Sequence, residues 1–212
     1  MCLGIYDNNK IYGYHLETGR KLSSLLALSI ARALEAAGLG FKDIDYFACG
    51  LGPGSFTGMR TGVAAIKGLS WVLKKPIIGI STLDILAQGV KESDNPVIPI
   101  VDAKRNLIYC AIFRKKRGRL KRMSPYMLLS LEEFLRKARP KSIFLGDAIN
   151  LYKEKILERL KGATFLDKDY WYPKAHNLIT LAQEGIKEKK FKNTFEIKPI
   201  YLYPKECQVK KA

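Results

Sequence analysis

The chain has few of the residues that most enzymes use for chemistry. It contains two histidines, His15 and His176, and no H-x-x-x-H or H-E-x-x-H pair that could hold a metal ion. No serine lies in a G-x-S-x-G turn, so a Ser-His-Asp set is disfavoured. The cysteines lie far apart, without a C-x-x-C pair, at Cys2, Cys49, Cys110 and Cys207. This spacing argues against a zinc knuckle and against a disulfide framework.

Long apolar runs are also absent. No stretch approaches the roughly 18 uninterrupted apolar residues that a membrane-spanning helix needs. Residues 1–7 do not combine a basic region with a following apolar run, which is the pattern of a signal peptide. We therefore expect a cytoplasmic protein with no membrane partner.

Positive charge is abundant and unevenly placed. The net charge is +17. Residues 1–100 carry 10 Lys and Arg against 8 Asp and Glu, a net +2, whereas residues 101–212 carry 27 against 12, a net +15. A basic half favours a polyanionic partner, with nucleic acid first. A Lys-rich solvated surface on amphipathic helices would give the same count, and both interpretations stay open.

Apolar periodicity predicts an α/β protein. The expected strands are 3–6, 11–15, 44–49, 76–80, 97–101, 107–114, 120–123 and 142–145, and the expected helices are 21–37, 61–73, 83–90, 131–138, 151–160 and 178–189. Residues 44–80 read strand, turn, helix, strand, which predicts a parallel pair. The polar residues 91–96 are the best boundary between an N-terminal lobe, 1–95, and a basic C-terminal lobe, 96–212. The tail 197–203 looks extended.

A glycine-rich turn, Gly50–Arg60, is the most informative segment. Its backbone could cradle an anion or let another chain come close. It matches neither G-x-x-x-x-G-K-[ST] nor G-x-G-x-x-G, because Thr57 stands where the last glycine of the second pattern should be. Gly54, Gly58 and Gly62 recur every four residues and so share one helix face. That face favours close contact, either with a partner or with the protein's own sheet.

Other candidates are weaker. Asp102 and Asp147 each follow an expected strand, where α/β proteins often place functional groups, and both could equally be turn residues. The aromatic cluster Tyr170–Pro173 could stack bases, although such clusters more often close a small core. The helix 21–37 has charges only at Lys21, Arg32 and Glu35, so it should be covered on more than one face.

The turn and the residues after it resemble the bacterial TsaB (YeaZ) family. The match is carried by Gly50–Arg60, by the following residues 61–69 and by residues 76–84. Weaker supporting matches are Asp102–Arg105 with Tyr109, Phe144–Asp147 and Pro199–Leu202.

The resemblance implies an actin-like, hexokinase-like ATPase (ASKHA) fold of two related α/β lobes, with mixed sheets flanked by helices. It implies a non-catalytic subunit in the synthesis of threonylcarbamoyladenosine beside the anticodon of tRNA. The implied partners are the catalytic paralogue TsaD and the ATPase TsaE, with a homodimer when the chain is alone. ATP and a metal would then be used by the complex through those partners, and this chain alone would bind no cofactor and no metal.

The resemblance places the pairing surface on the first two helices. The residues expected at the partner interface are Leu22, Leu25, Leu26, Gly54, Phe56, Thr57, Gly58, Arg60 and Gly62. Those expected near a nucleotide are Gly52, Gly54, Ser55 and Asp102. No catalytic residue is expected.

One departure from the family pattern concerns the N-terminus. The family opens with an apolar strand ending in Asp-Thr-Ser, whereas here Met1 falls inside what should be the second strand. We expect the natural start to lie upstream and the first sheet to be short of an inner strand. Two other functions stay open, a stand-alone peptidase or small-molecule kinase of the same fold, and a tRNA-binding module acting through the basic lobe.

Overall fold

Contacts divide the protein into two units, each built from two stretches of the chain. The computed structural model describes residues 1–15, 22–90, 93–116 and 118–204. The first unit is Met1–Ser81 with Pro173–Pro199, and the second is Thr82–Tyr172 with the described residues from Ile200 onward. The polar loop at 93–96, expected as a boundary, lies inside the second unit. The reason is that Leu83, Leu86 and Ala87, before the loop, share a core with Val97 and Val101 after it.

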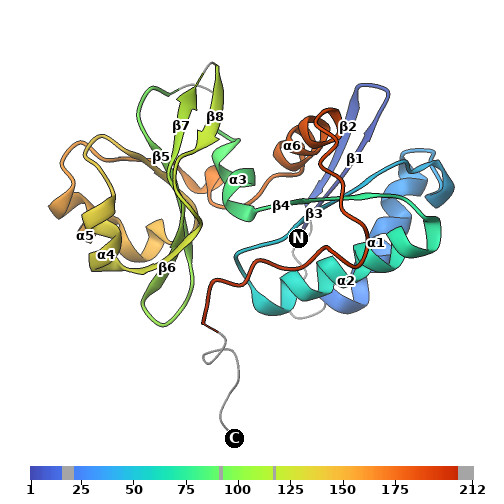
Figure 1. The fold of residues 1–212 in the computed structure, drawn as a ribbon, viewed down its shortest axis with the longest axis horizontal. Coiled ribbons are helices and arrows are strands. Elements are labelled where there is room, and N and C mark those ends of the chain that lie inside the picture. Colours follow the sequence, from blue (N-terminus) through green and yellow to red (C-terminus); the bar gives the residue numbers. More distant parts are fainter. Residues whose placement is uncertain (16–21, 91–92, 117, 205–212) are drawn as a thin grey trace, which may run out of the picture. The chain divides into compact units, whose positions relative to one another are not determined.

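In the described residues of the first unit, short strands pack with long helices (Figure 1). In chain order they are β1 (Cys2–Asp7), β2 (Lys10–His15), α1 (Leu22–Ala36), β3 (Phe47–Gly50), α2 (Phe56–Leu73), β4 (Ile77–Ile80) and α6 (Ala175–Lys187). The hairpin β1–β2 turns at Asn8 and Asn9, whose φ angles of 45° and 66° suit the left-handed conformation that asparagine tolerates. The β3–α2–β4 segment forms the expected parallel pair, with Phe47 opposite Ile77.

These strands form two separate two-stranded sheets. Among the described residues, β1 pairs with β2 alone and β3 pairs with β4 alone. Three helices pack on these sheets: α1 on β1, α2 on β3 and β4, and α6 on all four strands. Ile5 of β1 is buried with Leu26 and Ile30 of α1. Helix α6 thus packs on both sheets although they share no ladder.

The second unit is built on one mixed sheet. Its elements are α3 (Thr82–Ala87), β5 (Val97–Asp102), β6 (Leu107–Cys110), β7 (Phe113–Lys116), β8 (Arg119–Arg122), β9 (Met127–Ser130), α4 (Leu131–Lys137), β10 (Ile143–Leu145), α5 (Ile149–Arg159) and β11 (Thr164–Phe165). The strand order is β11-β10-β5-β6-β9, with β7 joining β5 and β8. The pairs of β10 with β5 and with β11 are parallel and the others are antiparallel. The mixed α/β architecture is therefore confirmed.

Strand β5 explains why this sheet is covered on both faces. Ile98 and Ile100 lie in one buried cluster with residues of α4 and α5. Val97 and Val101 lie in another with residues of α3. A continuous apolar run is what such a doubly covered strand requires.

Several local predictions need correction. The expected strand 107–114 is two strands, β6 and β7, which pair with different parts of β5. Strands β9 and β11 are not among the expected elements.

Trp171 of the aromatic cluster packs against a core cluster and donates its indole N–H to the Leu166 carbonyl at 3.1 Å, so it closes a core rather than offering a free ring face. No helix among the described residues has the length and apolarity to cross a membrane.

Candidate functional site

The first half of the glycine-rich turn is a structural element. Leu51, Gly52 and Pro53 are buried, and the Leu51 N–H donates to the Ile80 carbonyl at 2.8 Å. Gly52 has a φ of +89°, and a Cβ there would overlap the Met59 sulfur. A side chain at Gly52 would therefore be both strained and obstructed. This part of the turn joins β3 firmly to α2.

The second half of the turn starts helix α2. Ser55 is its N-cap, and Ser55 Oγ accepts from the Gly58 N–H at 3.3 Å. The cap thus uses one of the donors that an anion would need at this helix end. Ser55, Phe56 and Thr57 are exposed. The predicted proximity of Gly52, Gly54 and Ser55 to a nucleotide stays a prediction.

Helix α2 and the turn before it present small residues to open space. A Cβ built on Gly54, Gly62 or Gly68 would meet no atom within 4 Å beyond the neighbouring residues and the helix's own backbone. By contrast, a Cβ on Gly79 would lie 2.5 Å from Leu51 Cδ1, and one on Gly185 would lie 3.1 Å from Ile78 Cγ2. Those two glycines serve packing within the unit. Gly62 and Gly68, the two glycines of α2 that face open space, do not pack in this way.

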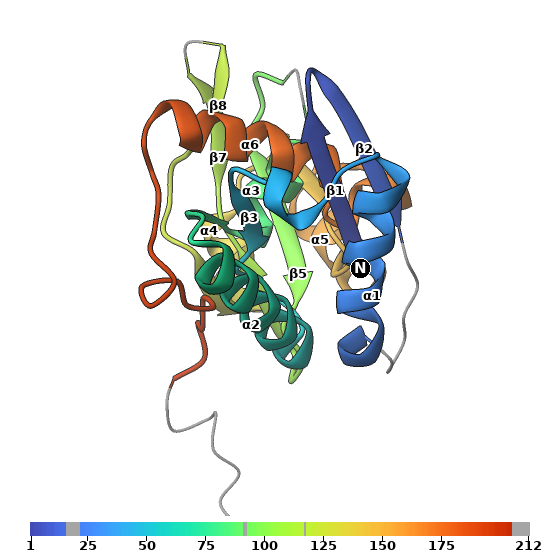
Figure 2. The ribbon, with the colours of Figure 1, turned by 90° about the vertical axis from the view of Figure 1, so that its right-hand side faces the viewer.

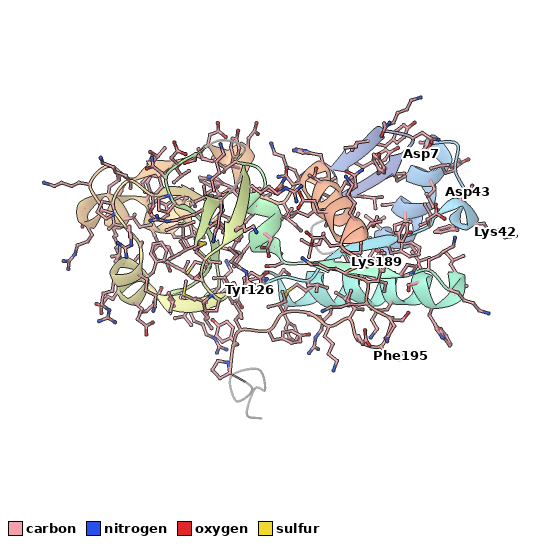
Figure 3. All side chains as sticks on the ribbon, turned by 45° about the horizontal axis from the view of Figure 1, so that its top comes forward. Asp7, Lys42, Asp43, Tyr126, Lys189 and Phe195 are labelled. Carbon is pink, nitrogen blue, oxygen red and sulfur yellow. The ribbon has the colours of Figure 1, made fainter. Side chains whose placement is uncertain are left out.

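Large apolar side chains are also exposed on α2, and Trp71 and Val72 lie one turn after Gly68. Trp71 is 68% exposed, Val72 73% and Phe56 46%. The Arg60 guanidinium lies 3.8 Å from the centre of the Phe56 ring. Phe195 is 76% exposed and follows Thr194, whose hydroxyl lies 3.1 Å from that of Ser70 on α2, so its segment runs beside the helix (Figure 3). Exposed apolar surface of this extent is typical of a protein contact.

Helix α1 lies beside α2 and adds to the same surface (Figure 2). Leu25 is half-buried, but Leu26 is buried in the unit's own core, so it supports the helix from behind rather than offering contact surface. Leu28, which is not among the predicted interface residues, is 46% exposed. Leu22 belongs to α1, and its side chain lies outside the described part of the chain. Trp71 could have been found by extending the helical spacing on α2, because it lies three residues after Gly68.

The second unit brings the two singled-out carboxylates together. Asp102 ends β5, and Asp147 follows β10, its parallel neighbour. The Asp102 N–H donates to Asp147 Oδ1 at 2.9 Å, and the Asp102 carboxylate receives the Lys104 N–H at 2.8 Å and Lys104 Nζ at 2.5 Å. Gly146, with a φ of +107°, makes the turn possible, because a Cβ there would overlap the Ile100 carbonyl.

The environment separates the pKa values of these two carboxyl groups. Burial raises the pKa of Asp147, and the Asp102 N–H only partly offsets this. Burial also acts on Asp102, but the hydrogen bonds and charge of Lys104 outweigh it and lower the pKa of Asp102. Within the described ranges, no three His, Cys, Asp or Glu side chains gather in a group that could hold a metal ion. Asp102 and the glycine-rich turn lie in different units.

Comparison with known proteins identifies the family. The family model described as TsaD, tRNA N6-adenosine threonylcarbamoyltransferase, matches residues 16–205. The protein named tRNA threonylcarbamoyladenosine biosynthesis protein TsaB of Bacillus subtilis is 31% identical over 80% of this chain and 74% of its own length. The TsaB of Buchnera aphidicola from Schizaphis graminum is 30% identical over 84% and 85%.

Solved structures show the same fold. YeaZ from Pseudomonas aeruginosa superposes with a TM-score of 0.82 at 24% identity, covering 95% of this chain and 93% of its own. A second crystal structure from that organism, of a protein with similarity to the peptidase YeaZ, gives 0.82 at 23% identity, covering 95% and 94%. Sequence and fold agree over nearly the whole chain. The chain therefore belongs to the TsaB (YeaZ) family.

Proposed function

We propose that this protein is a non-catalytic pairing subunit in the synthesis of threonylcarbamoyladenosine in tRNA. Its curated relatives are named for that biosynthesis. The observation that carries the pairing role is the exposed face of α2, where Gly68 stands open one turn before Trp71 and Val72.

This face suits a helix from another chain. Small residues let two backbones approach closely, and adjacent aromatic and aliphatic side chains supply the buried contact area. Helix α2 carries only two charged side chains, Arg60 and Lys67, over 18 residues. The proposed interface comprises the exposed parts of α1 and α2, including Leu25, Phe56, Thr57, Gly58 and Arg60, with Leu28 and Trp71 added and Leu26 behind them.

The proposed partners follow from the family. TsaD would be a paralogue of this chain, and both would have the actin-like, two-lobed ASKHA fold. TsaD would transfer the threonylcarbamoyl group, and TsaE would join the complex as an ATPase. ATP and metal would then be held by those partners. In this proposal the chain presents a fixed helical surface and leaves the chemistry to TsaD.

Substitution on the open face tests the proposal. Gly62→Leu places a large side chain where a partner backbone would approach, and we expect it to abolish co-purification with TsaD from the same genome and to lower base modification. Lys155→Leu puts the same side chain on an exposed position of α5 and should leave both unchanged. Intact pairing of the Gly62→Leu protein on a sizing column would contradict the proposal.

A direct contact with tRNA is the second candidate, and the hairpin β7–β8 favours it. Among its described residues, this hairpin exposes six basic side chains, namely Arg114, Lys115, Lys116, Arg119, Lys121 and Arg122. The Arg122 guanidinium lies 3.9 Å from the centre of the Tyr126 ring. Such a ribbon can follow a phosphate backbone without reading sequence.

A further inference from the structure

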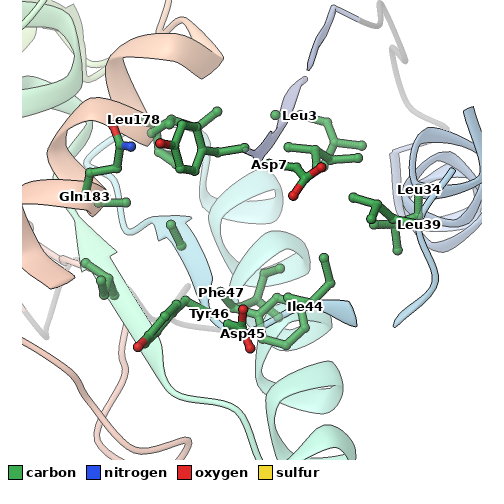
Figure 4. Close-up of a pocket in the computed structure, with 18 of the residues that line it drawn as sticks. Leu3, Asp7, Leu34, Leu39, Ile44, Asp45, Tyr46, Phe47, Leu178 and Gln183 are labelled. Atoms are coloured by element: carbon green, nitrogen blue, oxygen red, sulfur yellow. The ribbon is translucent and has the colours of Figure 1, made fainter. Parts of the chain in front are cut away.

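The second unit contains a cleft whose charge is opposite to that of the cavity in the first unit. The cavity of the first unit, of about 450 Å³, is lined by apolar side chains and by polar ones that include the carboxylates of Asp7 and Asp45 (Figure 4). The cleft of the second unit, of about 390 Å³, is lined by Arg114, Lys137 and Arg139 and by no acidic side chain of the described residues. Three cations that share one cleft repel one another, so an anion bound there would stabilise all three.

Separate elements bring these cations together. Arg114 belongs to β7, Lys137 is the last residue of α4, and Arg139 lies in the turn that leads to β10. All three side chains are exposed, and none of them forms an ion pair within the described ranges. The acidic residue one turn before Lys137, Glu133, accepts the N–H and the hydroxyl of Ser130, both at 2.9 Å. Its carboxylate is therefore engaged at the start of α4, at the opposite end from Lys137.

The floor of the cleft is apolar. Ile98 of β5 is buried, and Ile112, between β6 and β7, packs on the same core cluster. Met123, which follows β8 and also lines the cleft, is 56% exposed. A thioether makes favourable contacts with aromatic rings. The cleft therefore suits an anion that is attached to a flat ring.

The polar groups around this floor are paired within the protein. The Ile112 N–H donates to Ser124 Oγ at 2.9 Å, and the Ile112 carbonyl accepts the Met123 N–H at 2.7 Å. The Ser142 hydroxyl donates to the Arg139 carbonyl at 2.7 Å. The lining thus offers cations and apolar surface, but few hydrogen-bonding groups that could distinguish one ring from another.

The hairpin β7–β8 extends the row of cations away from the cleft. Residues directly opposite each other in a sheet share one face, and the faces alternate along each strand. Arg114 is opposite Lys121, and Lys116 is opposite Arg119. All four residues on the face that carries Arg114 are therefore cations, whereas Phe113 on the other face is buried. Like charges directly opposite each other destabilise a hairpin, and a bound polyanion removes that cost.

We propose that the cleft binds one unpaired nucleotide of an RNA strand that runs along this face of the hairpin. The phosphate lies among Arg114, Lys137 and Arg139, and the base packs on Ile112 and Met123. Cations along the backbone and side chains against splayed bases are the usual means of holding single-stranded RNA. Because few groups of the lining are left to read a base edge, the cleft accepts different bases with similar affinity. This inference rests on the second candidate function, direct contact with tRNA.

Charge-matched variants test the cleft in the full chain. The probe is a fluorescent oligouridine of about ten nucleotides, and its binding is measured by anisotropy. Lys137→Gln with Arg139→Gln removes two cations of the cleft, whereas Arg136→Gln with Lys155→Gln removes two exposed cations outside it. We expect the first pair to weaken binding at least about tenfold, because charged partners of the phosphate are lost. The control pair should weaken binding by less than about threefold.

A neutral substitution tests the contact with the base. Met123→Ala keeps every charge, and the exposure of this side chain means that the fold should be unaffected. It should weaken oligouridine binding by at least about threefold. The binding of inorganic polyphosphate should stay unchanged, because that polyanion has no base. Oligocytidine should bind within about threefold of oligouridine.

The outcomes separate the cleft from the hairpin. If the wild type binds tRNA but the two double variants weaken oligouridine binding equally, the cleft proposal is overturned and the second candidate function stands. Unchanged oligouridine binding by Met123→Ala overturns the proposal too, because the ligand would then be the phosphate alone. So does free uridine monophosphate that competes as well as oligouridine at equal nucleotide concentration, since the site would then serve a small molecule. A wild-type chain that binds neither oligouridine nor tRNA contradicts both ideas.

Discussion

Gly52 and Gly54 stand two residues apart and have opposite surroundings. Gly52 combines a φ of +89° with the Met59 sulfur at its Cβ position, whereas nothing lies near the Cβ position of Gly54. We predict that Gly52→Ala lowers the free energy of unfolding by about 1 to 3 kcal/mol. Gly54→Ala should change it by less than about 1 kcal/mol. Chemical denaturation of both variants measures the difference, and equal values would show that Met59 and the turn adapt freely.

Asp147 contributes to stability by accepting a hydrogen bond, which does not require its charge. Its Oδ1 receives the Asp102 N–H, which an asparagine can also accept. We predict that Asp147→Ala costs about 1 to 3 kcal/mol, because that N–H loses its acceptor. Asp147→Asn should keep the hydrogen bond and be clearly more stable than Asp147→Ala at pH 7. Thermal melts of the two variants would contradict this if they coincided.

The pH dependence of the Asp147→Asn variant follows from the direction of the pKa shift. Burial raises the pKa of Asp147 in the folded protein above 3.8, so the folded state binds the proton more tightly than the unfolded state. That contribution to stability is complete below pH 3.8 and is lost as the pH rises through the folded pKa. Relative to the wild type, the Asn variant should therefore gain stability between about pH 3.8 and neutrality. If the stability of the Asn variant relative to the wild type fell over this pH range, the raised pKa of Asp147 would be contradicted.

At the scale of elements, the two tryptophans have opposite surroundings. Trp71 is 68% exposed on α2, whereas Trp171 packs on a core cluster and donates to Leu166. We predict that Trp71→Ala changes the free energy of unfolding by less than about 0.5 kcal/mol but weakens pairing with TsaD. Trp171→Ala should cost at least about 1 kcal/mol. Denaturation and co-purification of both variants separate the two roles.

Local sequence patterns predict most of the elements, because their determinants are local. The Asn8-Asn9 turn, the strand–turn–helix at Gly50–Arg60 and the apolar run of β5 each carry their own signal. Strands β9 and β11 have only four and two residues and depend on neighbours distant in sequence. The burial of Leu26 and the exposure of Leu28 could not be predicted either, because both lie on a helix that is apolar over much of its surface. Which face it buries is set by β1 and α2.

The candidate sites divide in the same way. The glycine spacing indicates a contact face, but only the structure gives the open space beside Gly62 and Gly68. Asp102 and Asp147 stand out separately in the sequence, and their contact depends on the parallel register of β5 and β10.

At the scale of the whole molecule, the question is whether the net charge of +17 acts as a diffuse field or through one surface. The hairpin β7–β8 concentrates exposed cations, including Lys115, Lys116 and Lys121. If it binds phosphates, each neutralised phosphate releases counterions and steepens the dependence of tRNA affinity on salt. The logarithm of the binding constant should then fall linearly with the logarithm of salt concentration.

Two triple variants with the same change in net charge distinguish the alternatives. Replacing Lys115, Lys116 and Lys121 by glutamine should reduce the salt slope by about one unit for each phosphate that the hairpin no longer neutralises. Replacing Lys155, Lys161 and Lys168, which are exposed elsewhere in the same unit, removes the same three charges. Filter binding at several salt concentrations gives both slopes. Specific binding through the hairpin requires the first variant to lose more of its salt dependence than the second. If the two slopes fall equally, the excess charge acts as a diffuse field.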